Sequence, residues 1–226
     1  MLYTFIGCAI IFLLFVFIYT RQPKGERVSL LTCAIAMLLG AIPCFFLAFF
    51  FQIFAGAYIR KIGIDATAVV FIENFLIVAL SEELFKFIAG TIISKNRCKS
   101  RINYVTVFAA VGTGFDIMES SMQMSDALSM IVRCVLAIHI SLQIVMGVFY
   151  SKDKKILALV VPVLIHGVYD YGLSSGFSAL FNNPSADDAL IIVGVAVAAF
   201  AFLIWSLSYA NSIGKEEKKI ETIIEK

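Results

Sequence analysis

Ionisable side chains interrupt the apolar stretches of this chain, and their types are those that carry acid–base chemistry. The stretch LIVALSEELFKFIAG, residues 76–90, contains the adjacent glutamates Glu82 and Glu83, followed by Lys86. On a helix, Lys86 lies one turn from either glutamate and can neutralise it on the same face. Carboxylates beside an amine can take up and release protons during a reaction. This stretch is therefore the first candidate for a catalytic segment.

The next three apolar stretches each add polar groups of the same kind. Asp116 and Glu119 lie in GTGFDIMES, His139 lies in RCVLAIHISLQIVMG, and His166 and Asp170 lie in LIHGVYDYG. The chain has two histidines, and both fall near the middle of an apolar stretch. The i, i+4 spacing of the last pair lets the carboxylate accept a ring N–H and orient the imidazole. Four successive stretches are thus expected to bring one polar face each to a shared site.

The formal charge of this polar set is unbalanced. Five acids face two bases, a formal charge of −3: Glu82, Glu83, Asp116, Glu119 and Asp170 against Lys86 and Arg133. In a low-dielectric interior such an excess is costly, and neighbouring acids cannot all stay ionised. Protonated carboxylates, charged histidines or a bound divalent cation can relieve it. Each remedy leaves tuned acid–base groups around a hydrated pocket, which is the setting for hydrolysis.

The composition places these charges in a membrane protein. Of the 226 residues, 61% are hydrophobic and 15% charged, and the mean hydropathy is +0.94. Soluble domains are roughly 45–50% apolar and about a quarter charged. We expect one all-α integral membrane domain over residues 1–226, with the motifs inside about 70–175. The net charge of +2 suggests no nucleic-acid partner.

Hydropathy predicts seven apolar segments near the length that a bilayer requires, about 20 residues each. Their approximate limits are 2–20, 29–54, 68–93, 104–123, 129–150, 156–174 and 188–210. The first lacks the basic start and the cleavage site of a signal peptide, so we expect a retained helix. Pro43 and Pro162 fall inside the second and sixth segments, where they are expected to cause local kinks.

Basic residues in the connections predict the orientation. Fourteen of them follow the first, third, fifth and seventh segments, whereas the other side has only Arg60 and Lys61. The positive-inside rule places the fourteen in the cytoplasm, with the N-terminus outside. The C-terminal sequence KEEKKIETIIEK is then cytoplasmic, and we expect a solvated helical extension.

Each feature also has a structural interpretation. A single glutamate–lysine pair or a lone histidine usually serves packing, and Glu73 and Arg133, near the outer interface, are expected to be structural. Buried acids and histidines also suit a transporter or channel that relays protons or cations, although no internal repeat is visible. A catalytically silent scaffold is a third alternative. The combination across four segments favours a catalytic site.

At these residues the sequence resembles the PrsW family of bacterial intramembrane proteases. The four family motifs appear here in order as Glu82-Glu83-x-x-Lys86, Phe115-x-x-x-Glu119, His139 with Gly147 beyond it, and His166-x-x-x-Asp170. The related CAAX-type endopeptidases match less well, because they usually carry an arginine one position after Lys86 and a histidine at position 119. The first two segments and the last carry no specific match.

The resemblance implies an endopeptidase of the bacterial cytoplasmic membrane that cuts a membrane-anchored regulator. The family role is the first cleavage of a single-span anti-sigma factor, which starts an envelope-stress response.

We expect seven residues to carry the reaction: Glu82, Glu83, Lys86, Glu119, His139, His166 and Asp170. In this hypothesis Glu82 or Glu83 activates a water, the other glutamate shares its proton, and Lys86 holds the pair ionised. The two histidines bind the water or stabilise the oxyanion. In a metal-dependent alternative, His139, His166 and Glu119 would bind one divalent ion such as zinc. The sequence leaves the choice of glutamate and the metal question open.

Overall fold

The computed structural model describes residues 2–124, 126–135, 137–182 and 186–224, and within them every regular element is a helix. The α-helices are α1 (Leu2–Tyr19), α2 (Leu30–Leu39), α3 (Phe45–Ile59), α4 (Ala66–Ile72), α5 (Leu80–Ser94), α6 (Arg101–Gln123), α7 (Ala127–Val135), α8 (Ile138–Ser151), α9 (Lys155–Asn182) and α10 (Ala186–Ile224). A short 3₁₀ turn spans Lys24–Glu26, and π-helical segments span Gly40–Cys44 and Glu73–Ala79. The expected all-α class is confirmed.

Four helical segments are long and apolar enough to cross a membrane: Leu2–Tyr19, Leu30–Ile59, Lys155–Leu173 and Leu190–Ile223. Ile138–Ser151 is apolar but shorter. The expected segments at 68–93 and 104–123 carry the charged residues of the polar set, which lower their hydropathy. Membrane helices are therefore present, while the count of seven and the orientation stay predictions.

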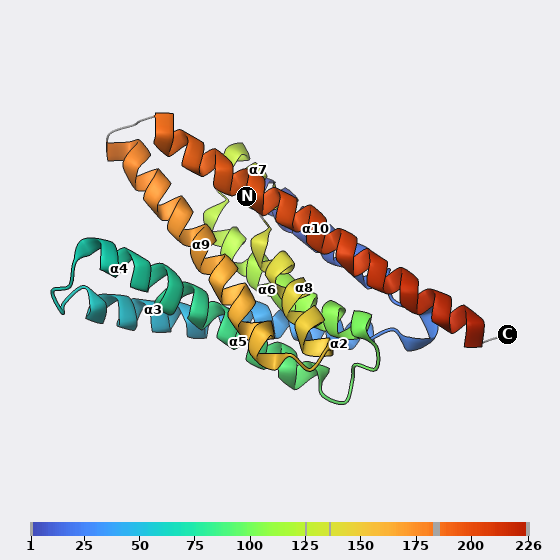
Figure 1. The fold of residues 1–226 in the computed structure, drawn as a ribbon. Helices are drawn as coiled ribbons and strands as arrows, with labels where there is room; N and C mark the ends of the chain where they lie inside the picture. Colours follow the sequence, from blue (N-terminus) through green and yellow to red (C-terminus); the bar gives the residue numbers. More distant parts are fainter. Residues whose placement is uncertain (1, 125, 136, 183–185, 225–226) are drawn as a thin grey trace.

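Helix α6 occupies the middle of the bundle and packs against α1, α2, α5 and α8 (Figure 1). Close approach to its neighbours depends on glycines, as expected where backbones meet in membrane bundles. A Cβ atom at Gly114 would overlap the backbone carbonyl of Met37 on α2. A Cβ atom at Gly112 would lie 2.8 Å from the carbonyl oxygen of His139 on α8. These contacts fix the depth at which α6 and α8 meet.

The second expected segment contains Pro43 within a local change of helix type. This residue lies inside the π-helical segment Gly40–Cys44, which joins α2 to α3 without a break in the helix. Proline has no N–H to donate, and a π-helical turn is one way in which a helix accommodates that loss. Pro162 lies inside α9, which continues on both sides of it. A second π-helical segment directly precedes the two glutamates of α5.

The expected segment at 129–150 is divided into two helices, α7 and α8. Helix α7 ends at Val135, and α8 begins at Ile138 after Ala137, whose φ of −59° and ψ of 64° are not helical. Residue 136 lies outside the described residues. Hydropathy depends on how apolar a segment is and not on whether its helix is continuous. The separation of α7 from α8 therefore could not be predicted from it. As a result, His139 lies in the first turn of α8.

The two longest helices, α9 and α10, run side by side along one side of the bundle, while α3 and α4 form a hairpin on another side (Figure 1). Helix α10 includes the expected helical extension of the C-terminal sequence. That extension is packed as well as solvated: the Glu217 carboxylate accepts the backbone N–H groups of Arg101 at 2.8 Å and Ile102 at 3.3 Å. It therefore caps the first turn of α6.

We expect Gly114→Ala to lower the free energy of unfolding by about 1–3 kcal/mol, because its methyl group would press on the α2 backbone. Gly194→Ala is the matched control, since no heavy atom lies within 4 Å of a Cβ built there. That control should be neutral or gain up to about 1 kcal/mol of helix propensity. Thermal unfolding in detergent measures both, and equal effects would contradict the close α2–α6 contact.

Candidate active site

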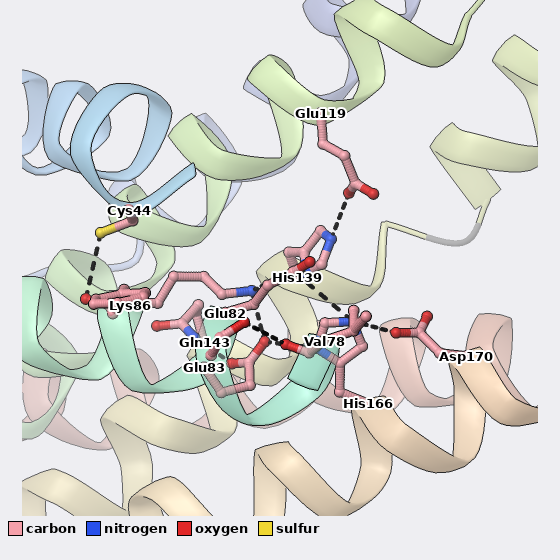
Figure 2. Close-up of polar contacts among 12 residues, drawn as sticks. Cys44, Val78, Glu82, Glu83, Lys86, Glu119, His139, Gln143, His166 and Asp170 are labelled. Atoms are coloured by element: carbon pink, nitrogen blue, oxygen red, sulfur yellow. Dashed lines mark hydrogen bonds and ion pairs between the residues drawn. The ribbon is translucent and has the colours of Figure 1, made fainter. Parts of the chain in front are cut away.

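All seven residues expected to carry chemistry lie together in the structure (Figure 2). Helix α5 supplies Glu82, Glu83 and Lys86 from its first two turns, and α6 supplies Glu119 from its C-terminal part. Helix α8 supplies His139, and α9 supplies His166 and Asp170. Hydrogen bonds and ion pairs connect these side chains across the four helices, as the following contacts show.

Glu83 is the most enclosed member of the cluster, with a side chain that is 0% exposed. Its Oε1 atom lies 2.6 Å from Lys86 Nζ and 3.0 Å from His166 Nδ1. Its Oε2 atom accepts the Gln143 side-chain amide at 2.8 Å. Both carboxylate oxygens are thus engaged by groups of three helices, α5, α8 and α9. Glu83 is held as an anchor and has no free oxygen for a reactant.

Lys86 is also fully buried, and every polar contact of its ammonium lies within the cluster. Besides Glu83, its Nζ atom lies 3.0 Å from His139 Nδ1 and 3.6 Å from Glu82 Oε2. It also lies 4.1 Å from the centre of the Phe115 ring, a cation–π geometry. Buried charges persist only when they are paired and hydrogen-bonded. The position of Lys86 therefore depends on groups from three helices, α5, α6 and α8.

His139 connects the lysine to the second acid. Its Nε2 atom lies 2.7 Å from Glu119 Oε2, so this nitrogen donates its proton to the carboxylate, and Nδ1 accepts from Lys86. Glu119 is held in turn by Arg133, with N–O distances of 3.2 and 3.4 Å. Arg133 was expected to be structural at the outer interface. The structure places it beside the cluster as the counter-ion of Glu119.

His166 lies between two carboxylates. Its Nδ1 atom lies 3.0 Å from Glu83 Oε1, and its Nε2 atom lies 3.2 Å from Asp170 Oδ2. Asp170 thus makes the orienting contact that the i, i+4 spacing predicts. The His166 ring is 5.1 Å from the ring of His139, centre to centre. The two imidazoles face the same small volume.

Glu82 differs from its neighbour Glu83 in one decisive respect. Its Oε1 atom accepts the Gln52 side-chain amide at 3.0 Å, but its buried Oε2 atom has no hydrogen-bond partner. That oxygen lies 4.0 Å from His139 Nδ1 and 3.9 Å from His166 Nε2. A buried carboxylate oxygen left unpaired is costly unless a reactant or an ion completes it. Glu82 therefore has the free oxygen that Glu83 lacks.

A cavity of about 410 Å³ opens at this point. Its polar lining residues come from seven helical segments and are Gln52, Asn74, Glu82, Glu119, Arg133, His139, His166, Tyr169 and Asp170. Glu83 and Lys86 do not line it. The cluster thus has two parts. Residues that line the cavity, such as Glu82 and the two histidines, are accessible to a reactant, whereas Glu83 and Lys86 lie behind them and hold them in place.

Sequence reasoning missed two glutamines that hold the cluster. Gln143 lies one helical turn after His139, on the same face, and holds Glu83. Gln52 lies within the aromatic run FFFQIF of α3 and holds Glu82. A polar side chain inside an apolar run is the signal that could have found both. Glu73 lies away from the cluster, where it pairs with Arg60 at 2.6 Å.

Asp116, which the sequence left ambiguous, lies beside the cluster on α6 and is 2% exposed. One of its oxygens accepts the Ser120 hydroxyl at 3.3 Å, and the other has no hydrogen-bond partner. Its carboxylate lies within 4.8 Å of Glu119 and His139. It does not line the cavity.

The ligand atoms suitable for a metal form two groups among the described residues. Glu82, Glu83, His139 and His166 form one, and Asp116, Glu119 and His139 form the other. The expected set of His139, His166 and Glu119 is therefore split between them, and Glu82 is the carboxylate between the imidazoles.

The first group fits a divalent metal. The ring nitrogens that face Glu82 are Nδ1 of His139 and Nε2 of His166. The opposite ring nitrogens, Nε2 and Nδ1, donate to Glu119 and Glu83. A carboxylate behind each metal-binding imidazole is the usual arrangement at protein metal centres. Two histidines and one carboxylate are also a known catalytic zinc set. In addition, the unpaired Glu82 oxygen gives the group an open ligand atom.

Comparison with known proteins identifies the family. The family described as PrsW family intramembrane metalloprotease matches residues 28–207, which contain every residue of the cluster. Neither the curated proteins nor the solved structures contain a match. The match spans most of the chain and agrees with its apolar helices. The chain thus belongs to the PrsW family and is an intramembrane protease. It is embedded in the lipid bilayer, and its substrates are membrane proteins.

Proposed function

We propose that this protease hydrolyses a peptide bond with a water that Glu82 activates. The observation that carries the proposal is the buried Oε2 atom of Glu82, which has no hydrogen-bond partner, lies about 4 Å from both imidazoles and belongs to a residue that lines the cavity. Glu83, the other candidate base, has both oxygens occupied and does not reach the cavity. A base must be able to contact the water from which it takes the proton.

The reaction then follows from the positions of the groups. Glu82 Oε2 takes a proton from water, and the water oxygen forms a bond to the peptide carbonyl carbon. The Nε2–H group of His166, which Asp170 orients, donates to the carbonyl oxygen as negative charge develops there. Glu82 returns the proton to the leaving nitrogen, and the C–N bond breaks. One new carboxyl terminus and one new amino terminus result.

The remaining residues hold this geometry. Glu83 fixes His166 and Lys86, and Lys86 places a positive charge 3.6 Å from the Glu82 oxygen. An opposite charge at that distance favours the ionised form that a base requires. Glu119, itself held by Arg133, fixes the ring of His139. Side chains held within about half an ångström of the productive geometry are what efficient catalysis requires.

A divalent metal, which the family description implies, would be held by Glu82 Oε2, His139 Nδ1 and His166 Nε2. It would take the place of the Lys86 contact at His139 Nδ1 and of the proton that His166 Nε2 shares with Asp170. When bound, it would supply Lewis-acid chemistry to the same water and carbonyl group. The chain's own residues keep their positioning roles in either case, because Glu119 and Glu83 hold the opposite ring nitrogens of the two histidines.

The finer features of the function are part of the same proposal. The resemblance to the family supports a single-span regulatory protein of the anti-sigma type as substrate, in the bacterial cytoplasmic membrane. The fourteen basic residues support seven spans in one domain, with the N-terminus outside and the C-terminus in the cytoplasm. The family match gives the transporter alternative no support.

Substitution of Glu82 and substitution of Glu83 should affect cleavage and stability differently. Glu82→Gln should reduce cleavage by at least about 100-fold, with little change in stability, because it removes the base and keeps the shape. Glu83→Gln should also lower the free energy of unfolding by about 3–5 kcal/mol, because it leaves Lys86 buried without its ion-pair partner. Co-expression with candidate single-span proteins, read by product fragments, measures cleavage, and thermal unfolding measures stability.

Asp126→Asn, an exposed acid outside the cavity, is the control and should change neither quantity. Normal cleavage by Glu82→Gln would end the proposal for the base. Fragments that also form in cells without this protein come from other proteases and are subtracted before the comparison.

Metal binding should distinguish the two groups of ligand atoms. We expect the purified full-length protein to bind about one equivalent of zinc, and Glu82→Gln to weaken that binding by at least about tenfold, since it removes a charged ligand. Asp116→Asn is the matched control, because it changes the other buried acid with an unpaired oxygen. Loss of zinc in Asp116→Asn and retention in Glu82→Gln would place the metal in the second group.

A further inference from the structure

One polar side chain in the lining of the catalytic cavity has no role in the mechanism above. Tyr169 lies on α9, three residues after His166 and directly before Asp170, and all three residues line the cavity. Positions i, i+3 and i+4 share one face of a helix. Tyr169 therefore belongs to the same wall of the cavity as the imidazole of His166.

The hydrogen bonds of the lining residues set Tyr169 apart. Every other polar side chain of the described lining has at least one hydrogen bond or ion pair to the protein: Gln52 with Glu82, Asn74 with the Val70 carbonyl, Arg133 with Glu119, His139 with Lys86 and Glu119, and His166 with Glu83 and Asp170. The hydroxyl of Tyr169 has no hydrogen-bond partner among the residues that the structure describes. It is thus a donor that the protein itself leaves unused.

Packing, and not a hydrogen bond, holds the ring of Tyr169. The ring is half-buried and packs against the apolar cluster of Ile138, Leu142 and Ala199. A tyrosine hydroxyl away from bulk water usually finds a partner within the protein. Here the ring is fixed while its hydroxyl stays available, so no internal hydrogen bond has to break before the hydroxyl donates to a molecule in the cavity.

Hydrolysis creates a need for such a donor. The carbonyl oxygen of the peptide bond becomes negative as the water oxygen binds the carbonyl carbon, and donors held at that oxygen stabilise the transition state. In the mechanism above His166 Nε2 is one donor, but its proton is shared with Asp170 Oδ2, 3.2 Å away. A second donor without a competing carboxylate would stabilise the negative charge further.

The size of the cavity brings the two walls within reach of one peptide unit. Its volume of about 410 Å³ is near the lower end of the roughly 300–1,000 Å³ found for pockets that hold one small molecule. A peptide unit with its carbonyl carbon beside the Glu82 oxygen therefore fills much of the cavity and meets the α9 wall, to which Tyr169 belongs.

We propose that Tyr169 is a further catalytic residue, whose hydroxyl donates a hydrogen bond to the carbonyl oxygen of the cut peptide bond as negative charge develops there. The phenol keeps its proton throughout. The proton transfers from water to Glu82, and from Glu82 to the leaving nitrogen, are therefore unchanged. Tyr169 and His166 then form a pair of oxyanion donors on one helix. This inference rests on the proposed function.

Tyr169→Phe removes the hydroxyl and keeps the packed ring. We expect kcat to fall at least about 100-fold, because loss of one oxyanion donor lowers kcat by roughly 10²–10³-fold. KM and the unfolding temperature should stay close to the wild-type values. Tyr150→Phe is the matched control: Tyr150 is also half-buried, and its hydroxyl has no hydrogen bond among the described residues, but it does not line the cavity.

The substrate for this measurement is identified first. New N-termini are mapped by mass spectrometry in membranes of bacterial cells that express the full chain. Sites that form with wild type and not with Glu82→Gln identify the proteins that this enzyme cuts. The most abundantly cut protein is purified, and its cleavage by the purified full chain in detergent is followed at several concentrations, which gives kcat and KM. Thermal unfolding of each variant reports its stability.

The outcomes separate this inference from the proposed function. Equal kcat values for Tyr169→Phe and Tyr150→Phe would overturn the role of the hydroxyl and leave Glu82 as the base. A higher KM with unchanged kcat would also overturn it, because that change indicates a contact made equally in the bound substrate. So would a loss of kcat that only follows a lower unfolding temperature. The absence of any site that depends on Glu82 would overturn the proposed function, and the role of Tyr169 with it.

Discussion

The buried pair of Lys86 and Glu83 is the contact on which the rest of the site depends. Both side chains are 0% exposed, and a charge in that position needs partners on every side. Those partners are His166, His139 and the ring of Phe115, which come from α9, α8 and α6. The relative positions of four helices are thus set by the pairing of one buried ammonium with one buried carboxylate. Gly112 and Gly114 let α6 come close enough to complete it.

The hydrogen bonds and ion pairs that occupy both oxygens of Glu83 distinguish it from its neighbour Glu82. Lys86, His166 and Gln143 occupy both oxygens of Glu83, whereas Oε2 of the adjacent Glu82 has no hydrogen-bond partner. In the proposed mechanism these two identical neighbours therefore differ in chemistry: Glu83 holds the site and Glu82 contacts the reactant. The same separation holds with a metal bound, because Glu83 and Glu119 keep the far nitrogens of the histidines.

The sequence predicted the helical class and the residues of the cluster because ionisable groups in apolar segments have few uses other than function. It could not choose between Glu82 and Glu83, since that choice depends on Gln52 and Gln143, which come from other helices. It also missed the end of α7 before residue 136, because an apolar loop and an apolar helix have the same hydropathy. The partner of Arg133 was not predicted for a related reason: Glu119 belongs to another helix.

The most direct test of this account is the chemical accessibility of the two adjacent carboxylates. The folded protein is treated with a water-soluble carbodiimide and an amine, and fragment ions locate the modified residue. The account predicts modification of Glu82, which lines the cavity, and protection of Glu83 until the protein unfolds. Modification of Glu83 before Glu82, or of both at one rate, would contradict the division of roles between an anchoring and a reacting glutamate.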